Sequence, residues 1–271
     1  MIVKELTDKM DIETFSKIIK KFKNRREISK MVDKYLVPLE KEKFDNAEFT
    51  TPFKLRQEML DKIPEEFWKS PKKVFEPCSG KGGFLIDIID RFMIGLNGYI
   101  DDDEERNKFI VEKCLYFCDI NSTNIYINKL LIDHENKYKL NFYQGDTLKL
   151  DIKDKFNLLN FDAVIGNPPY NPPGCKGIGN SIWQSFTKLS IDKWLKKNGL
   201  LLFVHPPGWR KPNSKRSTFY GFFNKMTKDN QMIYLSIHPG SRHWMHRDSR
   251  TRHSLGSSYR QVRANRCQQV R

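Results

Sequence analysis

The sequence predicts an α/β protein built on a doubly wound, mostly parallel sheet, and three observations support this. Short apolar runs that suit buried strands alternate with segments of helical periodicity over residues 49–237. Polar and glycine- or proline-rich clusters follow these runs, at the strand ends where ligands gather in such sheets. A chain of 271 residues is long enough to bury the sheet under helices on both faces.

The elements follow in a regular order. Before the sheet, residues 11–36 place apolar side chains at helical spacing beside a basic face, which predicts one or two amphipathic helices. Carboxylates at 101–105 suit the start of a helix, and Asn198-Gly199 is typical of a helix C-cap. The predicted strands are 73–76, 114–118, 140–143, 163–165, 200–204 and 232–237, and the predicted helices are 84–93, 125–132, 182–196 and 218–228.

Composition narrows the class of protein. Hydrophobic residues make up 38% of the chain, which excludes a wholly disordered protein despite 30% charged residues. The apolar runs are too short to span a bilayer and the first residues do not resemble a signal peptide, so we expect no membrane association. The five cysteines form no Cys-x-x-Cys pair, which favours a reduced, cytoplasmic protein without a structural zinc site.

The net charge of +15 indicates a polyanionic partner, but the charge is unevenly placed. Residues 1–235 carry a net +8, and residues 236–271 carry +7 with eight arginines, no lysine and one acidic residue. Three interpretations of this tail stay open: a basic arm that contacts phosphates, a cloning artefact, and a reading frame that shifts near residue 238. The abrupt loss of lysine favours the shifted or truncated frame.

Glycines and acidic residues lie at successive strand ends. The segment Glu76-Pro-Cys-Ser-Gly80-Lys-Gly82-Gly separates a strand from a helix, and its glycines let a ligand approach the backbone. Asp119 ends the next strand, where a carboxylate can accept from both hydroxyls of a ribose, and Asp146 follows the strand after that. A solvated loop carboxylate is the ordinary interpretation of any one of them, but their repetition points to a ligand that contains adenosine.

The tetrapeptide Asn167-Pro168-Pro169-Tyr170 carries the most specific chemistry. The two prolines hold an extended backbone and remove two amide donors, so the Asn167 side-chain oxygen and the Pro168 carbonyl remain as acceptors. Tyr170 adds a flat face. Two acceptors can hold an exocyclic amine and aim its lone pair at an electrophilic carbon, which is catalysis by orientation and preorganised electrostatics. A proline-stiffened loop with a core tyrosine is the structural alternative.

In this order, the segments resemble the motifs of gamma-group adenine-specific (amino) DNA methyltransferases that depend on S-adenosylmethionine. Phe49-Thr-Thr51-Pro52 resembles motif X and precedes motif I, as in the gamma group. Leu200–Trp209 is similar to motif VI. Motifs I to IV are matched by Glu76-Pro-x-x-Gly80-x-Gly82, Asp119, Gly145-Asp146 and Asn167–Tyr170.

The resemblance implies a role for each matching residue. The cofactor would lie against the segments of motifs X, I, II, III and IV, through Thr51, Pro52, Glu76, Gly80, Gly82, Asp119, Ile120, Asp146, Thr147 and Asn167. Asn167 and Pro168 would bind the target amine, Pro169 would stiffen the loop, and Tyr170 would stack on a base flipped out of the duplex. No metal and no catalytic cysteine or histidine is implied.

Two further positions are left to packing. His205 directly follows a predicted strand and is expected to be a loop histidine rather than a base. Asn180, Trp183 and Phe186 lie where the family carries motif V, but a helix packed on the sheet explains the two aromatic residues equally well.

The chain also departs from the family's pattern. That fold ends with an antiparallel hairpin, and gamma members usually continue into a target-recognition domain. No strand-like run follows residue 237, so the sheet is expected to be incomplete at its C-terminal edge. The expected parts are an N-terminal helical segment (1–45), a catalytic domain (46–237) and a tail that is disordered or not native (238–271).

Methyl transfer to the N6 amino group of adenine in DNA is therefore the leading hypothesis, with a restriction endonuclease as a further partner. Two other substrates stay open: the glutamine of a release factor, because an amide nitrogen poses a similar problem, and adenine in RNA. A third hypothesis, of another class, is a non-catalytic remnant that still binds nucleic acid or cofactor.

Overall fold

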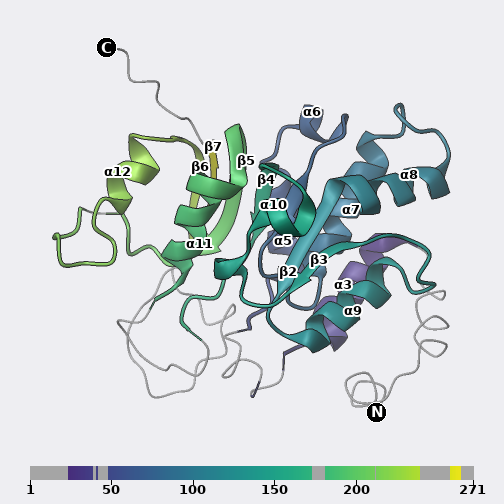
Figure 1. Cartoon of the computed structure of the whole chain (residues 1–271), viewed down its shortest axis with the longest axis horizontal. Coiled ribbons are helices and arrows are strands. Elements are labelled where there is room, and N and C mark those ends of the chain that lie inside the picture. Colours follow the sequence, from purple (N-terminus) through teal and green to yellow (C-terminus); the bar gives the residue numbers. More distant parts are fainter. Residues whose placement is uncertain are drawn as a thin grey trace.

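A seven-stranded sheet forms the centre of the protein (Figure 1), with the strand order β3-β2-β1-β4-β5-β7-β6. The computed structural model describes residues 24–38, 41, 48–172, 181–210 and 212–238, and the backbone of 257–263. The strands β1 to β5 pair in parallel, and β7 pairs antiparallel with both β5 and β6. The predicted α/β fold with a doubly wound sheet is confirmed.

The strands and helices alternate along the chain as the sequence predicts, with boundaries that shift by a few residues. The strands are β1 Val74–Glu76, β2 Leu115–Asp119, β3 Asn141–Gln144, β4 Phe161–Gly166, β5 Leu195–His205, β6 Gln231–His238 and β7 Ser257–Arg263. The helices are α3 Arg25–Tyr35, α5 Phe53–Leu60, α6 Glu65–Trp68, α7 Gly83–Gly95, α8 Asp103–Phe109, α9 Ser122–Ile132, α10 Ile152–Phe156, α11 Trp183–Leu189 and α12 Phe222–Thr227.

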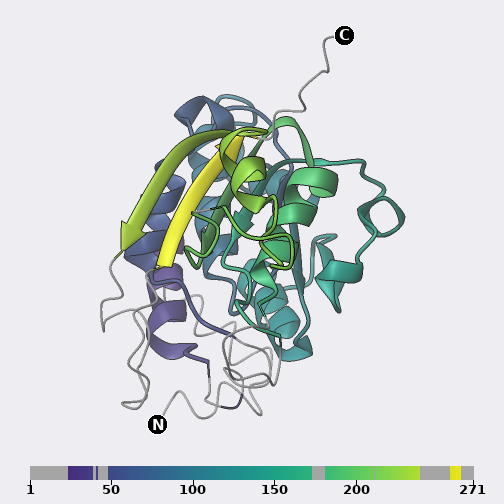
Figure 2. The same ribbon diagram turned by 90° about the vertical axis from the view of Figure 1, so that its left-hand side faces the viewer.

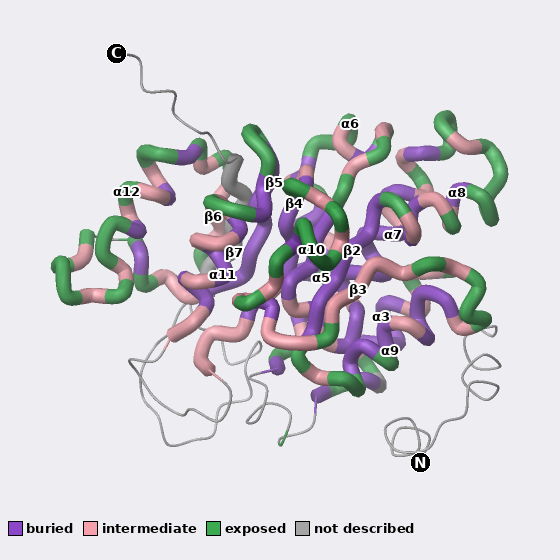
Figure 3. The backbone as a smooth tube through the Cα atoms, in the orientation of Figure 1, coloured by how far each residue is buried: buried purple, intermediate pink, exposed green. Residues whose placement is uncertain are grey.

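Both faces of the sheet are buried. Successive side chains of a strand point to opposite faces and therefore pack into two separate apolar layers. On β1, Val74 packs with α5, α6, α7 and α9 on one face, whereas Phe75 packs with α10, α11 and α12 on the other. Strand β5 repeats the pattern, with Leu202 on the first face and Phe203 on the second. The central strands are accordingly almost continuously buried (Figure 3), as expected for a parallel sheet between helix layers.

Helix α3 forms an outer layer on the first face. Asn24 caps its start by accepting a hydrogen bond from the Glu27 amide at 3.1 Å. Met31 and Val32 are buried in a third apolar cluster with side chains of α7 and α9. The predicted N-terminal helix is thus confirmed over residues 25–35, and residues 11–23 of that prediction lie outside the described part of the chain.

The predicted helix cap at Asn198-Gly199 is wrong. Asn198-Gly199 does not cap a helix: α11 passes into a π-turn over residues 190–194, and β5 begins at Leu195. The pair lies in an irregularity of β5, where the partner of Phe161 is Leu195 and that of Ala163 is Leu200. Asn198 has a φ of 62°, which asparagine tolerates in a bulge as well as in a cap.

The prediction of an incomplete sheet at the C-terminal edge is also wrong. The backbone of β7, within the tail, inserts between β5 and β6, and Figure 2 shows β6 and β7 side by side. A strand flanked on both sides by hydrogen-bonding backbones does not need a run of apolar residues. The other residues of 239–271 lie outside the described part, and the division at 45 and 237 stays a prediction.

No helix among the described residues is long and apolar enough to cross a bilayer. Cys78, Cys114 and Cys118 are free thiols. The cytoplasmic location stays a prediction.

Candidate functional site

Two adjoining cavities lie at the carboxyl ends of the parallel strands. The larger, about 360 Å³, is lined by Glu48, Phe49, Pro77, Cys78, Gly80, Asp119, Ile120, Asn124, Gly145, Asp146, Thr147, Leu148, Asn167, Pro169, Pro172, Ile182 and Phe186. The smaller, about 40 Å³, shares Glu48, Phe49, Cys78, Gly80 and Asn167 with it and adds residues of α3, of motif X and of the glycine loop, including Asp33, Thr51, Arg56 and Glu76. The strand ends that the sequence singles out therefore meet at one site.

Asp119 is held in place by the glycine loop and by the start of α9. Its Oδ2 accepts from the Gly80 amide at 2.7 Å, and its Oδ1 accepts from the Asn121 amide at 2.8 Å and from Asn124 Nδ2 at 3.2 Å. Burial raises the pKa of Asp119 to about 6, against the lowering effect of these donors. An ionised carboxylate has about four acceptor positions, so Asp119 keeps acceptor capacity for a ligand in the cavity.

A buried polar trio that sequence reasoning missed lies beside Asp119. Lys81 Nζ donates to Asn124 Oδ1 at 2.9 Å, and Asn124 Nδ2 donates to Glu48 Oε2 at 2.9 Å. Lys81 Nζ and Glu48 Oε1 are 3.6 Å apart, and all three side chains are buried. The sequence offered one indication, since Lys81 lies inside the glycine loop and Glu48 directly precedes the motif X segment.

Glu76, at the end of β1, has a buried carboxyl group with one oxygen that lacks a hydrogen-bond partner in the described part of the chain. Its Oε2 has no hydrogen-bond partner among the described residues, and the side chain faces the smaller cavity. Burial raises the pKa of Glu76 well above its ordinary value, and Arg56 only partly offsets this. A buried acceptor without a partner is costly unless a ligand supplies the donor.

Two glycines open α7 because neighbouring side chains leave no room for a larger residue. Gly82 has a φ of 82°, and a Cβ on it would lie 2.4 Å from Asn128 Oδ1. A Cβ on Gly83 would lie 2.7 Å from the guanidinium of Arg56. Gly82, which the motif resemblance assigns to the cofactor, therefore packs against Asn128 and does not line either cavity.

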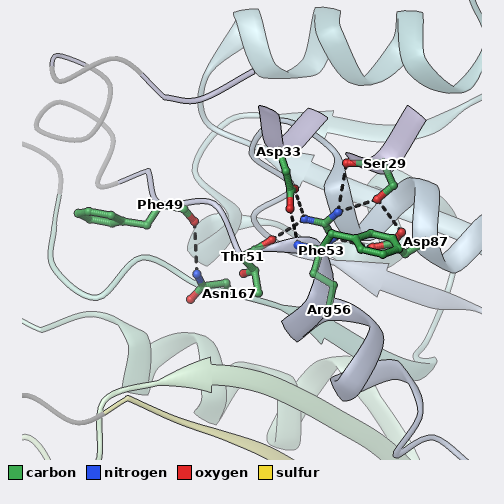
Figure 4. Close-up of polar contacts among 8 residues, drawn as sticks. All are labelled: Ser29, Asp33, Phe49, Thr51, Phe53, Arg56, Asp87 and Asn167. Carbon is green, nitrogen blue, oxygen red and sulfur yellow. Dashed lines mark hydrogen bonds and ion pairs between the residues drawn. The ribbon is translucent and has the colours of Figure 1, made fainter. Parts of the chain in front are cut away.

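At the end of β4, the amide of Asn167 is fixed in one orientation. Asn167 Nδ2 donates to the Phe49 carbonyl at 3.3 Å (Figure 4). A carbonyl can only accept, so this contact assigns the nitrogen and leaves Oδ1 as the second end of the amide. Oδ1 is buried and has no partner among the described residues. The site thus presents one fixed, unsatisfied acceptor.

The rest of the tetrapeptide is only partly in the cavity. Pro169 lines the larger cavity, and Pro168 is buried beside it. Tyr170 is half-buried, packs against both apolar clusters and does not line either cavity, and burial raises its pKa. Its stacking on a base stays a prediction. Pro52, at the start of α5, also lies outside both cavity walls.

The motif III turn completes the larger cavity. Asp146 caps a short 3₁₀ turn by accepting from the Leu148 amide at 3.1 Å, and Thr147 Oγ1 donates to the Pro77 carbonyl at 2.8 Å. Asp146, Thr147 and the half-exposed Ile120 all line the cavity.

The motif V and VI segments divide between the cavity and the core. Phe186 lines the larger cavity, whereas Trp183 stacks on His205 with ring centroids 4.5 Å apart. His205 is fully buried as the last residue of β5, so the expectation of a loop histidine is wrong. Asn180 lies outside the described residues. Within the described part, no group of three or more His, Cys, Asp or Glu side chains is arranged to hold a metal.

Comparison with known protein families identifies the family of this chain. The profile of the N-6 DNA methylase family matches residues 38–176, which is half of the chain and contains every cavity segment from motif X to the Asn-Pro-Pro-Tyr loop. The chain belongs to this family. Members of the N-6 DNA methylase family are methyltransferases, which agrees with the resemblance drawn from the motifs.

Individual proteins are also similar to this family member. An uncharacterized adenine-specific methylase from Mycoplasma pneumoniae is 25% identical over 269 residues, covering 71% of this chain and 62% of that protein. The chain therefore spans less than two thirds of this relative.

Among solved structures, a modification subunit of a putative type I restriction enzyme from Vibrio vulnificus has a TM-score of 0.61 at 14% identity, over 96% of this chain and 51% of that one. A putative class I S-adenosylmethionine-dependent methyltransferase from Listeria monocytogenes has a TM-score of 0.58 at 14% identity, over 97% and 72%. At this identity the two structures show the fold.

Proposed function

We propose that this protein transfers the methyl group of S-adenosylmethionine to the N6 amino group of adenine in DNA. The observation that carries the proposal is the Asn167 amide, whose nitrogen is held by the Phe49 carbonyl and whose buried Oδ1 has no described partner. A fixed acceptor on a residue that lines the 360 Å³ cavity suits an amine that must be held and turned before it reacts. Membership of the N-6 DNA methylase family supports the same chemistry.

The residues present fit the cofactor. Asp119 has acceptor capacity for ribose hydroxyls, and Asp146 faces the same cavity for an adenine amine. The unpartnered Glu76 Oε2 suits a donor such as the α-ammonium group of the methionine moiety, beside Thr51 and Gly80. When bound, S-adenosylmethionine supplies a methyl carbon on a positively charged sulfur, which leaves with the C–S electron pair.

The protein's own contribution to the reaction is orientation. Asn167 Oδ1 and the Pro168 carbonyl accept hydrogen bonds from the two N–H groups of the target amine. This arrangement favours a pyramidal nitrogen with its lone pair directed at the methyl carbon. The nitrogen forms the new N–C bond with its lone pair and releases one proton to the solvent. The base must leave the duplex to reach the cavity, since its amine is otherwise paired.

A basic loop beside the site suits the phosphates of DNA. Residues 206–221 follow β5 at the cavity edge of the sheet, lead into α12 and contain no acidic residue. Arg210, Lys215 and Arg216 are exposed and form no ion pair with any residue that the structure describes. Buried Trp209 and the partly buried Phe219 pack into the core at the two ends of the loop. Exposed cations without carboxylate partners are typical of a phosphate-contacting surface.

Transfer of radiolabel tests the proposal. The full chain is incubated with S-adenosylmethionine carrying a tritiated methyl group and, separately, with plasmid DNA, RNA and a release factor. Label in adenine of DNA that disappears with Asn167→Ala is expected, whereas label in RNA or in the release factor selects one of those substrates instead. Cofactor binding without transfer to any substrate refutes the proposal and favours a non-catalytic remnant.

A restriction endonuclease is a further proposed partner, suggested by the similarity to a modification subunit of a type I restriction enzyme. Co-purification from cells that contain such an enzyme tests it.

A further inference from the structure

A buried arginine connects the outermost helix to both working parts of the site. Arg56, on α5, is 2% exposed and lies between α3, the motif X segment and α7 (Figure 4). Its Nε donates to Asp87 Oδ2 at 2.6 Å, and its Nη1 donates to Asp33 Oδ1 at 2.6 Å and to the Thr51 carbonyl. Its Nη2 donates to Ser29 Oγ at 2.6 Å and to the Ser29 carbonyl at 3.5 Å. All five N–H groups of the guanidinium are therefore used.

The partners of Arg56 are connected to one another. Ser29 Oγ donates to Asp87 Oδ1 at 2.7 Å, and Asp33 Oδ2 accepts from the Phe53 amide at the start of α5. Burial alone would lower the pKa of Arg56, but Asp87 and Asp33 outweigh it and the pKa is raised, so the charge is permanent. The planar fork makes five hydrogen bonds to three chain segments at fixed angles, whereas a lysine has only three donors on a single nitrogen.

The segment that this network holds reaches the catalytic amide two residues away. Arg56 holds the Thr51 carbonyl, and the Phe49 carbonyl accepts from Asn167 Nδ2. Residues 49–51 also line the smaller cavity, together with Asp33 and Glu76. The same short stretch therefore forms a wall for the cofactor's methionine end and fixes the orientation of the acceptor amide.

We propose that Arg56 is a positioning residue that couples the cofactor site to the catalytic amide through residues 49–53, with α3 as its fixed support. This rests on the proposed function, and it extends the site beyond the family match at residues 38–176 to α3 at residues 25–35. Loss of the fork frees the Thr51 carbonyl, loosens the wall of the smaller cavity and lets the Asn167 amide rotate.

The test compares Arg56→Lys with Arg106→Lys. Arg106 is a matched control because it is also buried, at 5% exposure, and also holds backbone carbonyls, those of Ile100 and Asp101 at 2.6 and 2.9 Å, but lines neither cavity. Three quantities are measured on the full chain: the Kd for S-adenosylmethionine by calorimetry, amide hydrogen exchange of residues 49–53, and kcat with both substrates saturating.

We expect Arg56→Lys to weaken cofactor binding at least tenfold, to speed exchange in residues 49–53 and to lower kcat, whereas Arg106→Lys changes only the melting temperature. An unchanged Kd and unchanged exchange in a folded Arg56→Lys overturn the coupling, and so does a raised Kd with full kcat at saturation. If Arg56→Lys does not fold, Ser29→Ala, which removes one acceptor of the network, is measured in its place. Cofactor binding and exchange are read without a methyl acceptor, so a failure of the proposed function leaves the test of the network intact.

Discussion

Replacement of Gly82 by alanine probes the geometry on which the glycine loop depends. The residue has a φ of 82°, and alanine in the left-handed region costs about 1–2 kcal/mol. The new Cβ would also lie 2.4 Å from Asn128 Oδ1, so the Asn128 side chain must move. That side chain is fully buried and donates to Ser79 Oγ at 2.7 Å and to the Gly80 carbonyl at 3.2 Å. Loss of these bonds adds about 1–3 kcal/mol, which brings the expected loss of unfolding free energy to about 2–5 kcal/mol.

Denaturant unfolding of the cofactor-free protein measures this loss against two control glycines. Gly80→Ala carries only the conformational cost, because its φ is 50° and its nearest neighbour is Glu48 Oε1 at 3.8 Å. Gly98→Ala meets nothing within 4 Å and should be neutral. In an Asn128→Ala background, Gly82→Ala should cost no more than Gly80→Ala. The reasoning is refuted if Gly82→Ala costs the same with and without Asn128, or no more than Gly80→Ala in the wild-type background.

Three other predictions concern charge. Asp119 has its full acceptor capacity only when it is ionised, and its pKa is about 6. Affinity for S-adenosylmethionine should therefore fall as the pH drops below that value, by up to about tenfold per pH unit. Titration calorimetry should find this dependence absent in Asp119→Asn. The pKa of Glu76 is raised in the folded state, so its stabilising contribution is lost as pH rises. Glu76→Gln should therefore stabilise the cofactor-free protein more at pH 8 than at pH 4, while it weakens cofactor binding. An equal effect on stability at both pH values would contradict a buried, unpaired carboxylate. Alanine at Arg210, Lys215 and Arg216 should weaken duplex binding and lower the slope of log K against log salt by about 0.9 for each phosphate that the protein no longer neutralises, whereas alanine at Lys193 and Lys197, exposed near the other end of β5, should leave the slope unchanged.

From the sequence alone we could predict the fold class and the edge of the sheet at which the candidate site lies. Alternating strand and helix patterns require a buried parallel sheet, and ligands to such a sheet gather at its carboxyl edge. Glu76, Asp119, Asp146 and Asn167 all stand at strand ends and line one of two adjoining cavities. Local order along the chain suffices for this, because the parallel arrangement brings successive strand ends to one edge.

The side chains that hold this edge together could be identified only from the three-dimensional arrangement. Arg56, Glu48, Lys81 and Asn124 come from segments far apart in sequence, and no local pattern marks a buried ion pair such as that of Arg56 with Asp87. Strand β7 escaped sequence reasoning for a related reason, since it is stabilised by the backbones of β5 and β6 rather than by an apolar run of its own. Long-range pairing depends on what the rest of the chain brings alongside, and a linear pattern does not contain that information.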